Sequence, residues 1–246
     1  MTARIEKTVI GTRDITIFLP PAYNVNQKEF AVVYMQDGGE LVFKQVETIS
    51  RLMAGGKMEQ LIFVGIAPEQ RLDDYTPWPA VALTEKYPDF GGRGQQYLAF
   101  VVNEVKAYVE TKYRTRTGTE HTGIIGASLG GLISLYALYL YPQVFGKAGS
   151  FSGSFWYEGF VEYINQQPLP YQNSRIYLDV GSQEGIGKKT AQREMLHKTS
   201  EVYQILLNQG ITAANCRYSI SAGDTHGQRC FMRRFPAAVN WLFPMK

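Results

Sequence analysis

TGIIGASLGGL, at residues 122–132, is the stretch that most restricts the fold of this chain. Residues 122–125 have the β-branched composition of a buried strand, and the apolar residues 132–140 have the length of a buried helix. Between them stands GASLG, a G-x-S-x-G motif whose two glycines let the chain reverse sharply from strand to helix. Such an elbow holds Ser128 above the sheet. A glycine-rich packing turn without chemistry is the plainer alternative, and the spacing fits no phosphate-binding loop.

The segments around this motif alternate between short β-branched runs and longer stretches of helical period, which predicts an α/β fold with a mostly parallel central sheet. Residues 30–35 (FAVVYM) and 61–66 (LIFVGI) are continuous apolar runs, so we expect central strands with helices on both faces of the sheet. The whole chain, 1–246, is expected to form one domain. The other predicted elements are antiparallel strands at 5–10 and 15–19, strands at 174–180 and 216–220, helices at 97–113 and 190–207, and a short terminal helix at 236–243 with Pro236 in its first turn.

The composition excludes several classes of protein. With 45% hydrophobic and 19% charged residues, the 246-residue chain is not disordered. A net charge of +3, with basic residues only in isolated clusters, argues against a nucleic-acid partner. The uncharged stretch 122–145 is long enough to span a membrane, but its glycines and serines fit a strand, a turn and a buried helix better. No membrane partner is therefore predicted.

The sequence also indicates that a secretion signal, paired cysteines and a cofactor are absent. Residues 1–7 carry charges and lack the apolar segment of a secretion signal, so a cytoplasmic protein is expected. Cys216 and Cys230 have no C-x-x-C partner and are expected to be reduced, partly buried thiols. The chain has no metal-binding motif, so neither a metal nor another cofactor is expected.

A serine hydroxyl needs a base to become a nucleophile, and the chain offers three histidines. His197 is out of phase with the apolar face of its predicted helix and should point to water. His121 precedes the strand that leads to the motif, so it lies at the opposite end of the sheet from Ser128. His226 follows the last predicted strand, where a hydrolase of this type places its base. His226 is the preferred candidate, with a plain loop histidine as the alternative.

The acid that orients the base should lie between serine and histidine in the chain, in the loop after the penultimate strand. Glu184 occupies that position. Asp179, within the predicted strand, and Asp224, close to the histidine, remain open as alternatives, and each has a structural interpretation as well.

Charge on a substrate carbonyl oxygen requires backbone N–H donors, one from the residue after the nucleophile and one from a loop after an early central strand. Leu129 supplies the first. The second is expected from the turn at 35–39, where Gly38 is preferred over Gly39. A tight turn that merely requires glycine is compatible with this role.

Together, residues 32–243 resemble the putative esterase family that includes esterase D and the enterochelin (siderophore) esterases, a branch of the α/β-hydrolases. The similar motifs occur in the family's order and are VVYMQDG (32–38), DYTP (74–77), GASLGGL (126–132), SGSFW (152–156), and LDVG (178–181) with Glu184 and His226. The loop GGRG (91–94) departs from the family pattern by carrying Arg93. The resemblance implies an α/β-hydrolase fold with Ser128 as nucleophile, Glu184 as acid and His226 as base.

We therefore expect a serine esterase that acts through an acyl-enzyme on a small or aromatic carboxylic ester. The alternatives are a siderophore trilactone esterase, in which Arg71 and Arg93 would favour an anionic catecholate, an acyltransferase, and a non-catalytic binding module on the same scaffold. Aromatic side chains near the site are expected as pocket walls or, equally, as core. The candidate substrate contacts are Tyr75, Trp78, Arg93, Phe155 and Trp156.

Overall fold

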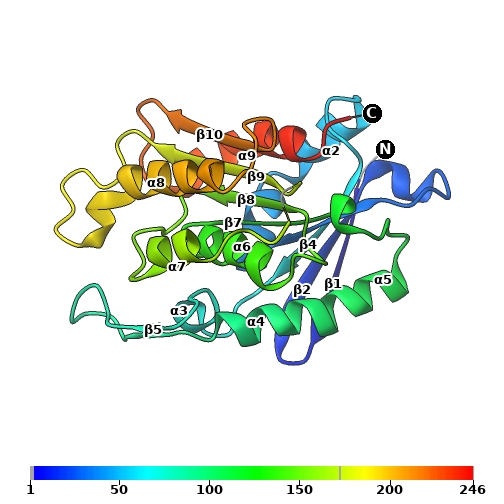
Figure 1. Ribbon diagram of the computed structural model, residues 1–246. Helices are drawn as coiled ribbons and strands as arrows, with labels where there is room; N and C mark the ends of the chain where they lie inside the picture. The colour runs from blue at the N-terminus through cyan, green and yellow to red at the C-terminus, as the bar shows by residue number, and fades with distance from the viewer. Residues whose placement is uncertain (1–2, 172, 246) are drawn as a thin grey trace.

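The computed structural model describes residues 3–171 and 173–245, and its central element is an eight-stranded sheet (Figure 1). Its strands are β1 (Arg4–Ile10), β2 (Arg13–Leu19), β3 (Ala31–Met35), β4 (Leu61–Ile66), β7 (Thr122–Ala127), β8 (Lys147–Phe151), β9 (Arg175–Gly181) and β10 (Cys216–Ser221). They lie in the order β1-β2-β4-β3-β7-β8-β9-β10. The β1–β2 and β2–β4 pairs are antiparallel and all other neighbouring pairs are parallel, which confirms the predicted mostly parallel sheet.

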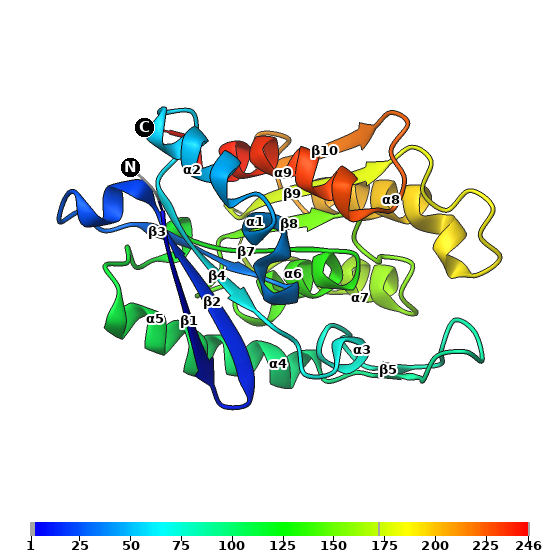
Figure 2. The ribbon, with the colours of Figure 1, turned by 180° about the vertical axis from the view of Figure 1, so that it is seen from behind.

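Helices cover both faces of this sheet, as the apolar central strands predicted (Figures 1 and 2). The helices are α1 (Glu40–Phe43), α2 (Val46–Ala54), α3 (Arg71–Asp74), α4 (Gly94–Phe100), α5 (Ala107–Lys112), α6 (Leu129–Leu140), α7 (Phe160–Gln166), α8 (Met195–Asn208) and α9 (Gln228–Leu242). One face is covered by α4 to α8 and the other by α1, α2 and α9. A short antiparallel pair, β5 (Pro79–Ala80) and β6 (Phe90–Gly91), lies apart from the main sheet.

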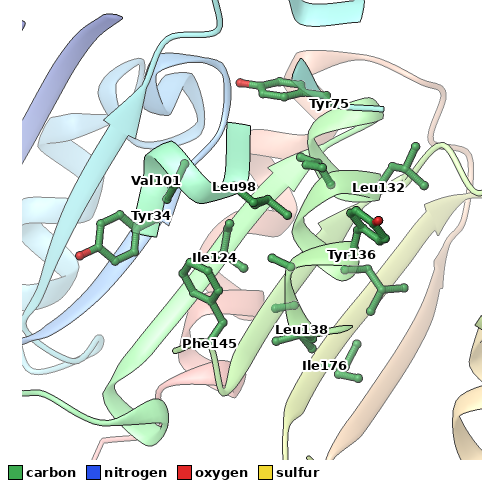
Figure 3. Close-up of a cluster of buried hydrophobic side chains, with 14 of the residues drawn as sticks. Tyr34, Tyr75, Leu98, Val101, Ile124, Leu132, Tyr136, Leu138, Phe145 and Ile176 are labelled. Carbon is green, nitrogen blue, oxygen red and sulfur yellow. The ribbon is translucent and has the colours of Figure 1, made fainter. Parts of the chain in front are cut away.

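The central strands are apolar at every position because successive side chains enter different cores. In β3, Tyr34 belongs to the cluster on the α6 face, whereas Val33 and Met35 belong to the cluster on the α9 face. Figure 3 shows Tyr34 in the first cluster with Ile124 of β7 and Leu132 of α6. Burying each such side chain stabilises the fold by about 1.5–3 kcal/mol, so both faces contribute to stability.

The helix predicted at residues 97–113 is continuous but not uniform. It runs from α4 through a π-helical stretch, Val101–Lys106, into α5. Val101, Val105 and Val109 are fully buried and line one face across this stretch. The apolar period therefore predicted the helix correctly, although it does not reveal the local change in hydrogen bonding.

The strand β8 has no counterpart among the elements expected from the sequence. Its residues, KAGSF, contain no apolar run, yet all five are buried. A Cβ atom on Gly149 would lie 3.0 Å from Ile125 Cγ1, so close packing against β7 favours a small residue there. Lys147 remains buried because its Nζ donates a hydrogen bond to the carbonyl of Leu242, 2.6 Å away. Tertiary packing, not strand propensity, determines this strand.

The prediction that Pro236 opens a short terminal helix is wrong. Pro236 lies inside α9, which begins at Gln228. Phe231, Phe235 and Val239 follow one another at a spacing of four residues and are buried on one face of this helix. Burial of that face continues the helix through the proline, despite the N–H that proline lacks.

Both cysteines are free. Cys216 is buried, and burial raises the pKa of its thiol to about 12, so it remains in the unreactive protonated form. Cys230 is partly buried. Within residues 3–171 and 173–245, no helix combines the length and the apolar character needed to cross a membrane.

A buried ion pair fixes the start of β2 to the segment that follows β4. The guanidinium of Arg13 donates to both carboxylate oxygens of Asp74, at 2.6 and 3.0 Å. The two side chains are only 9% and 6% exposed. The same carboxylate accepts hydrogen bonds from the backbone N–H groups of Glu69 and Gln70, at 2.9 and 3.3 Å. Asp74 thereby holds the chain where it enters α3.

A second buried ion pair joins α9 to the sheet. Arg234 Nη1 lies 3.3 Å from Asp179 Oδ1 in β9, and the side chains are 7% and 0% exposed. Asp179 Oδ2 has no hydrogen-bond partner among the described residues. Burial raises the pKa of Asp179 to about 7, even though Arg234 and the Ser152 N–H favour the charged carboxylate. The carboxylate therefore changes its charge near neutral pH.

Replacing Arg13 should destabilise the fold strongly. In Arg13→Ala the Asp74 carboxylate would remain buried without its cation, so we expect the free energy of unfolding to fall by about 3–5 kcal/mol. The measurement is urea unfolding at pH 7. Arg4→Ala is the control, because it removes an arginine from the adjacent strand whose side chain is 52% exposed, and it should cost less than about 1 kcal/mol. Equal losses in the two variants would contradict the role of the Arg13–Asp74 pair.

Asp179 should make the stability fall as pH rises. The folded protein holds this proton up to a pKa of about 7, whereas the unfolded chain releases it near 3.8, so its contribution is complete below pH 3.8 and lost towards pH 7. At 1.36 kcal/mol per unit this loss amounts to about 4 kcal/mol. Asp179→Asn lacks the titration, so its stability relative to wild type should be higher at pH 8 than at pH 5. Denaturant unfolding at both pH values provides the measurement, and an equal difference at both would refute this expectation.

Candidate active site

Ser128 stands at the turn between β7 and α6, at the carboxyl edge of the sheet. Its backbone has φ +58° and ψ −123°, a strained conformation for a residue with a side chain. The Ser128 N–H donates to the carbonyl of Phe151 at 2.9 Å, and the Ser128 carbonyl accepts from Leu132 at 3.0 Å. A Cβ atom on Gly126 would lie 2.4 Å from the Gly130 carbonyl oxygen, so this turn requires glycine. The G-x-S-x-G sequence thus folds into the predicted elbow.

His226 and Glu184 meet at the same edge of the sheet. His226 Nδ1 lies 2.7 Å from Glu184 Oε2, and the side chains are 36% and 0% exposed. Glu184 Oε1 accepts further hydrogen bonds from Ser152 Oγ at 2.5 Å and the Gly181 N–H at 2.7 Å. Burial acts to raise the pKa of Glu184, but these hydrogen bonds outweigh burial and lower it. Glu184 is therefore a charged acceptor that can orient His226.

Ser128 and His226 line the same two cavities. The larger one, about 650 Å³ in volume, is also lined by Gly38 and Arg71, and the smaller one measures about 90 Å³. The hydroxyl of Ser128 lies 3.3 Å from the hydroxyl of Ser154. Among the described residues no hydrogen bond joins Ser128 to His226, and such catalytic contacts are often long until substrate binds. The structure thus brings Ser128 and His226 to one opening, with the buried Glu184 carboxylate against His226.

The two alternative acids lie close to Glu184 but have other partners. Asp179 faces Arg234, as described above, and Asp224 forms ion pairs with Arg233 and Arg234. The carboxylate of neither aspartate contacts His226 in the described part of the chain.

Of the two expected oxyanion donors, Leu129 follows Ser128 in the chain and Gly38 lines the 650 Å³ cavity with it. Leu129 is the first residue of α6, so its N–H has no acceptor within the helix. In the turn after β3, the Asp37 N–H donates to Tyr75 Oη at 2.7 Å and the Gly39 N–H to the Gln36 carbonyl at 3.0 Å. The Gly38 N–H has no acceptor in residues 3–171 and 173–245. Of the two candidate glycines, Gly38 is therefore the one with an unused donor beside the cavity.

An ion pair that no sequence motif indicated lies beside this turn. Arg71 donates to both carboxylate oxygens of Asp37, at 2.7 and 3.1 Å, and to the carbonyl of Ala127 at 3.3 Å. Asp37 has φ +53°, a left-handed conformation in a residue that is not glycine. Arg71 also lines both the 650 Å³ cavity and a neighbouring cavity of about 330 Å³ that includes Ser128. The pairing of residues 37 and 71 could not be read from the sequence, since the contact arises from the packing of α3.

The proposed substrate contacts occupy different surroundings. Trp156 lines the 330 Å³ cavity. Tyr75 is fully buried beneath the turn after β3, and Phe155 is buried against Phe160 with ring centroids 5.7 Å apart. Trp78 packs among aromatic rings of α6 and α7, so these three line none of the cavities that contain Ser128.

Arg93 also lies outside those cavities. Its side chain is 67% exposed and its Nε is 3.8 Å from Asp73 Oδ2. The cavity of about 330 Å³ is instead lined by residues that the sequence did not single out, including Tyr87 and Lys188 from loops and Phe90 from the short strand β6. Loop residues far apart in the sequence carry no periodic signal that would predict their meeting.

Comparison with known proteins gives a family and a fold. A family model described as "Putative esterase" matches residues 8–242. The protein YbbA of Bacillus subtilis (strain 168), described as uncharacterized, is 39% identical over 243 residues, which cover 99% of this chain and 97% of YbbA. A siderophore enterobactin esterase of Emericella nidulans is 28% identical over 145 residues, which cover 53% of this chain and 48% of that protein.

Several solved structures with similar folds are described as esterases or hydrolases. An IroE-like serine hydrolase from Shewanella oneidensis superimposes with a TM-score of 0.79 at 17% identity, covering 98% of this chain and 78% of that one. The siderophore hydrolase EstA from Aspergillus nidulans gives 0.76 at 20% identity, with 98% and 95% covered. The enterobactin esterase FES from Shigella flexneri gives 0.79 at 17% identity, and the match covers 99% of this chain but 59% of FES. At these identities the likeness shows the α/β-hydrolase fold, and the family model shows that this chain belongs to the putative esterase family.

Proposed function

We propose that this protein is a serine carboxylic-ester hydrolase with Ser128 as nucleophile, His226 as general base and Glu184 as the orienting acid. One observation carries the proposal. Ser128 stands on a strained elbow at a cavity that His226 also lines, and His226 Nδ1 is hydrogen-bonded to the buried Glu184 carboxylate at 2.7 Å. The resemblance to esterases in family and fold supports the same reaction class.

The proposed reaction has two steps. With the proton on His226 Nδ1 directed at Glu184, Nε2 carries the lone pair that accepts the Ser128 proton as Oγ attacks the ester carbonyl. The N–H groups of Leu129 and Gly38 stabilise the resulting oxyanion, and His226 then protonates the leaving alcohol. Water activated by His226 hydrolyses the acyl-enzyme and regenerates Ser128. In an acyltransferase an acceptor alcohol would replace that water, so products formed with added alcohols distinguish the two.

The cavities favour a small or aromatic ester. Ser128 lines spaces of about 650 and 330 Å³, which would receive the two halves of an ester on either side of the hydroxyl. Trp156 and Phe90 offer aromatic surface in the smaller space.

A siderophore trilactone is the second candidate substrate. The 330 Å³ cavity combines the aromatic rings of Tyr87, Phe90 and Trp156 with the cations of Arg71 and Lys188. Rings and cations together suit an anionic catecholate. The Emericella nidulans relative, described as a siderophore enterobactin esterase, supports the same substrate class.

Removing the nucleophile should abolish hydrolysis. We expect Ser128→Ala to lower kcat/KM for p-nitrophenyl acetate by at least about 10⁴-fold, and Glu184→Gln to lower it by at least about 100-fold. Ser200→Ala, on α8 and away from the cavities around Ser128, is the control and should match wild type. Full activity of Ser128→Ala would refute the assignment, and an inactive wild type across acetate to long-chain esters would favour a binding module or a specialised substrate.

The Lys188 cation at the 330 Å³ cavity should affect only anionic substrates. If a catecholate trilactone such as enterobactin binds there, Lys188→Gln should raise its KM by up to about fivefold, the size of one exposed ion pair, without changing KM for p-nitrophenyl acetate. Lys189→Gln removes the same charge one residue away, outside the described cavity, and should have no effect. No trilactone hydrolysis by an enzyme active on p-nitrophenyl esters would exclude the siderophore candidate.

A further inference from the structure

Beneath Glu184 lies a buried group of charged side chains that the proposed mechanism does not use. Arg234 reaches it from α9, Asp179 from β9 and Asp224 from the loop after β10. Ser152, at the end of β8, stands between Arg234 and Glu184. All of these side chains are less than 9% exposed. Their interactions are therefore not weakened by solvent.

The direction of the hydrogen bonds follows from the chemistry of each group. A guanidinium can only donate, so the 3.1 Å contact between Arg234 Nη2 and Ser152 Oγ uses an acceptor lone pair of the serine. The single hydroxyl proton of Ser152 is then free to point at Glu184 Oε1, 2.5 Å away. Arg234 thus selects one orientation of the Ser152 hydroxyl.

The backbone of Ser152 is held as firmly as its hydroxyl. Ser152 has φ +50°, and its N–H donates to the carbonyl oxygen of Asp179 at 2.9 Å. Together with the Gly181 N–H, Ser152 occupies Glu184 Oε1 with two donors, which leaves Oε2 to face His226. A carboxylate with one oxygen fixed in this way cannot rotate without losing both bonds.

We propose that Arg234 and Ser152 are positioning residues that hold Glu184 in the orientation and charge state required by His226. The inference rests on the proposed function of Ser128, Glu184 and His226. Asp179 and Asp224 also lie against Arg234, at 3.3 and 3.7 Å, so the buried guanidinium has carboxyl neighbours besides Glu184. Glu184 Oε2 is left to pair with His226.

The test compares Ser152→Ala and Arg234→Gln with wild type in hydrolysis of p-nitrophenyl acetate from pH 3.5 to 9, a range that extends below the ordinary pKa of a glutamate. Arg229→Gln is the matched control, since it removes an exposed arginine from the same helix. Circular dichroism checks the fold, and titration of Ser128 with a fluorophosphonate counts the active sites. The charged and titratable groups around Glu184 are His226 and Arg234, which lie against it, and Asp179 and Asp224, which lie against Arg234.

Per titrated site, we expect kcat to fall about 10- to 100-fold in both variants, as for loss of a hydrogen bond to a charged group, with KM within about twofold. Because the Ser152 hydrogen bond lowers the pKa of Glu184, its removal should also move the acid limb of kcat/KM to higher pH. A merely structural role would reduce the number of titrated sites and leave the acid limb in place.

Two outcomes would overturn the inference. One is a kcat within about twofold of wild type with an unmoved acid limb, and the other is a loss confined to the number of titrated sites. If Arg234→Gln does not fold, Ser152→Ala decides alone. An inactive Ser128→Ala beside fully active Ser152→Ala would reject only this inference, whereas an active Ser128→Ala would reject the proposed function itself.

Discussion

The close approach of β7, α6 and β8 is the constraint on which the rest of the structure depends. A Cβ atom on Gly126 would lie 2.4 Å from the Gly130 carbonyl oxygen, and one on Gly131 would lie 2.5 Å from Ser150 Oγ. Only backbones without side chains can pass at such distances. The same turn carries Ser128 at a positive φ, at the edge where the carboxyl ends of the parallel strands β7 and β8 lie. Fold and candidate site therefore share one steric cause.

Sequence patterns predicted the central strands, which are buried on both faces. Residues 30–35 and 61–66 are apolar throughout because helices cover both faces, and the central strands β3 and β4 correspond to them. Chain order suggested Glu184 and His226 as partners, since loops after neighbouring parallel strands meet at one edge. Sequence alone left Asp179 and Asp224 open as the acid, because position in the chain does not show which carboxylate faces His226. In the structure all three carboxylates gather around Arg234, and Glu184 is the one that faces His226.

The features that sequence did not predict depend on tertiary contact. The strand β8 lacks an apolar run, because Gly149 and Ser150 fit a space too narrow for larger residues. Neighbouring aromatics also differ in direction, with Phe155 buried in the core and Trp156 at a cavity. Residue type indicates that such rings are apolar, but the turn that carries them decides which one meets solvent.

Much of the wall of the 330 Å³ cavity belongs to two segments outside the main sheet, the hairpin around β5 and β6 and residues 188–192 before α8 (Figure 1). Both leave and rejoin the scaffold without contributing a strand to the main sheet. Insertions, deletions and substitutions there alter the shape presented to a ligand while the elbow and its buried ion cluster stay unchanged. Evolution can accordingly diversify what relatives of this protein recognise at little risk to folding, and these two segments are where lineages should diverge first.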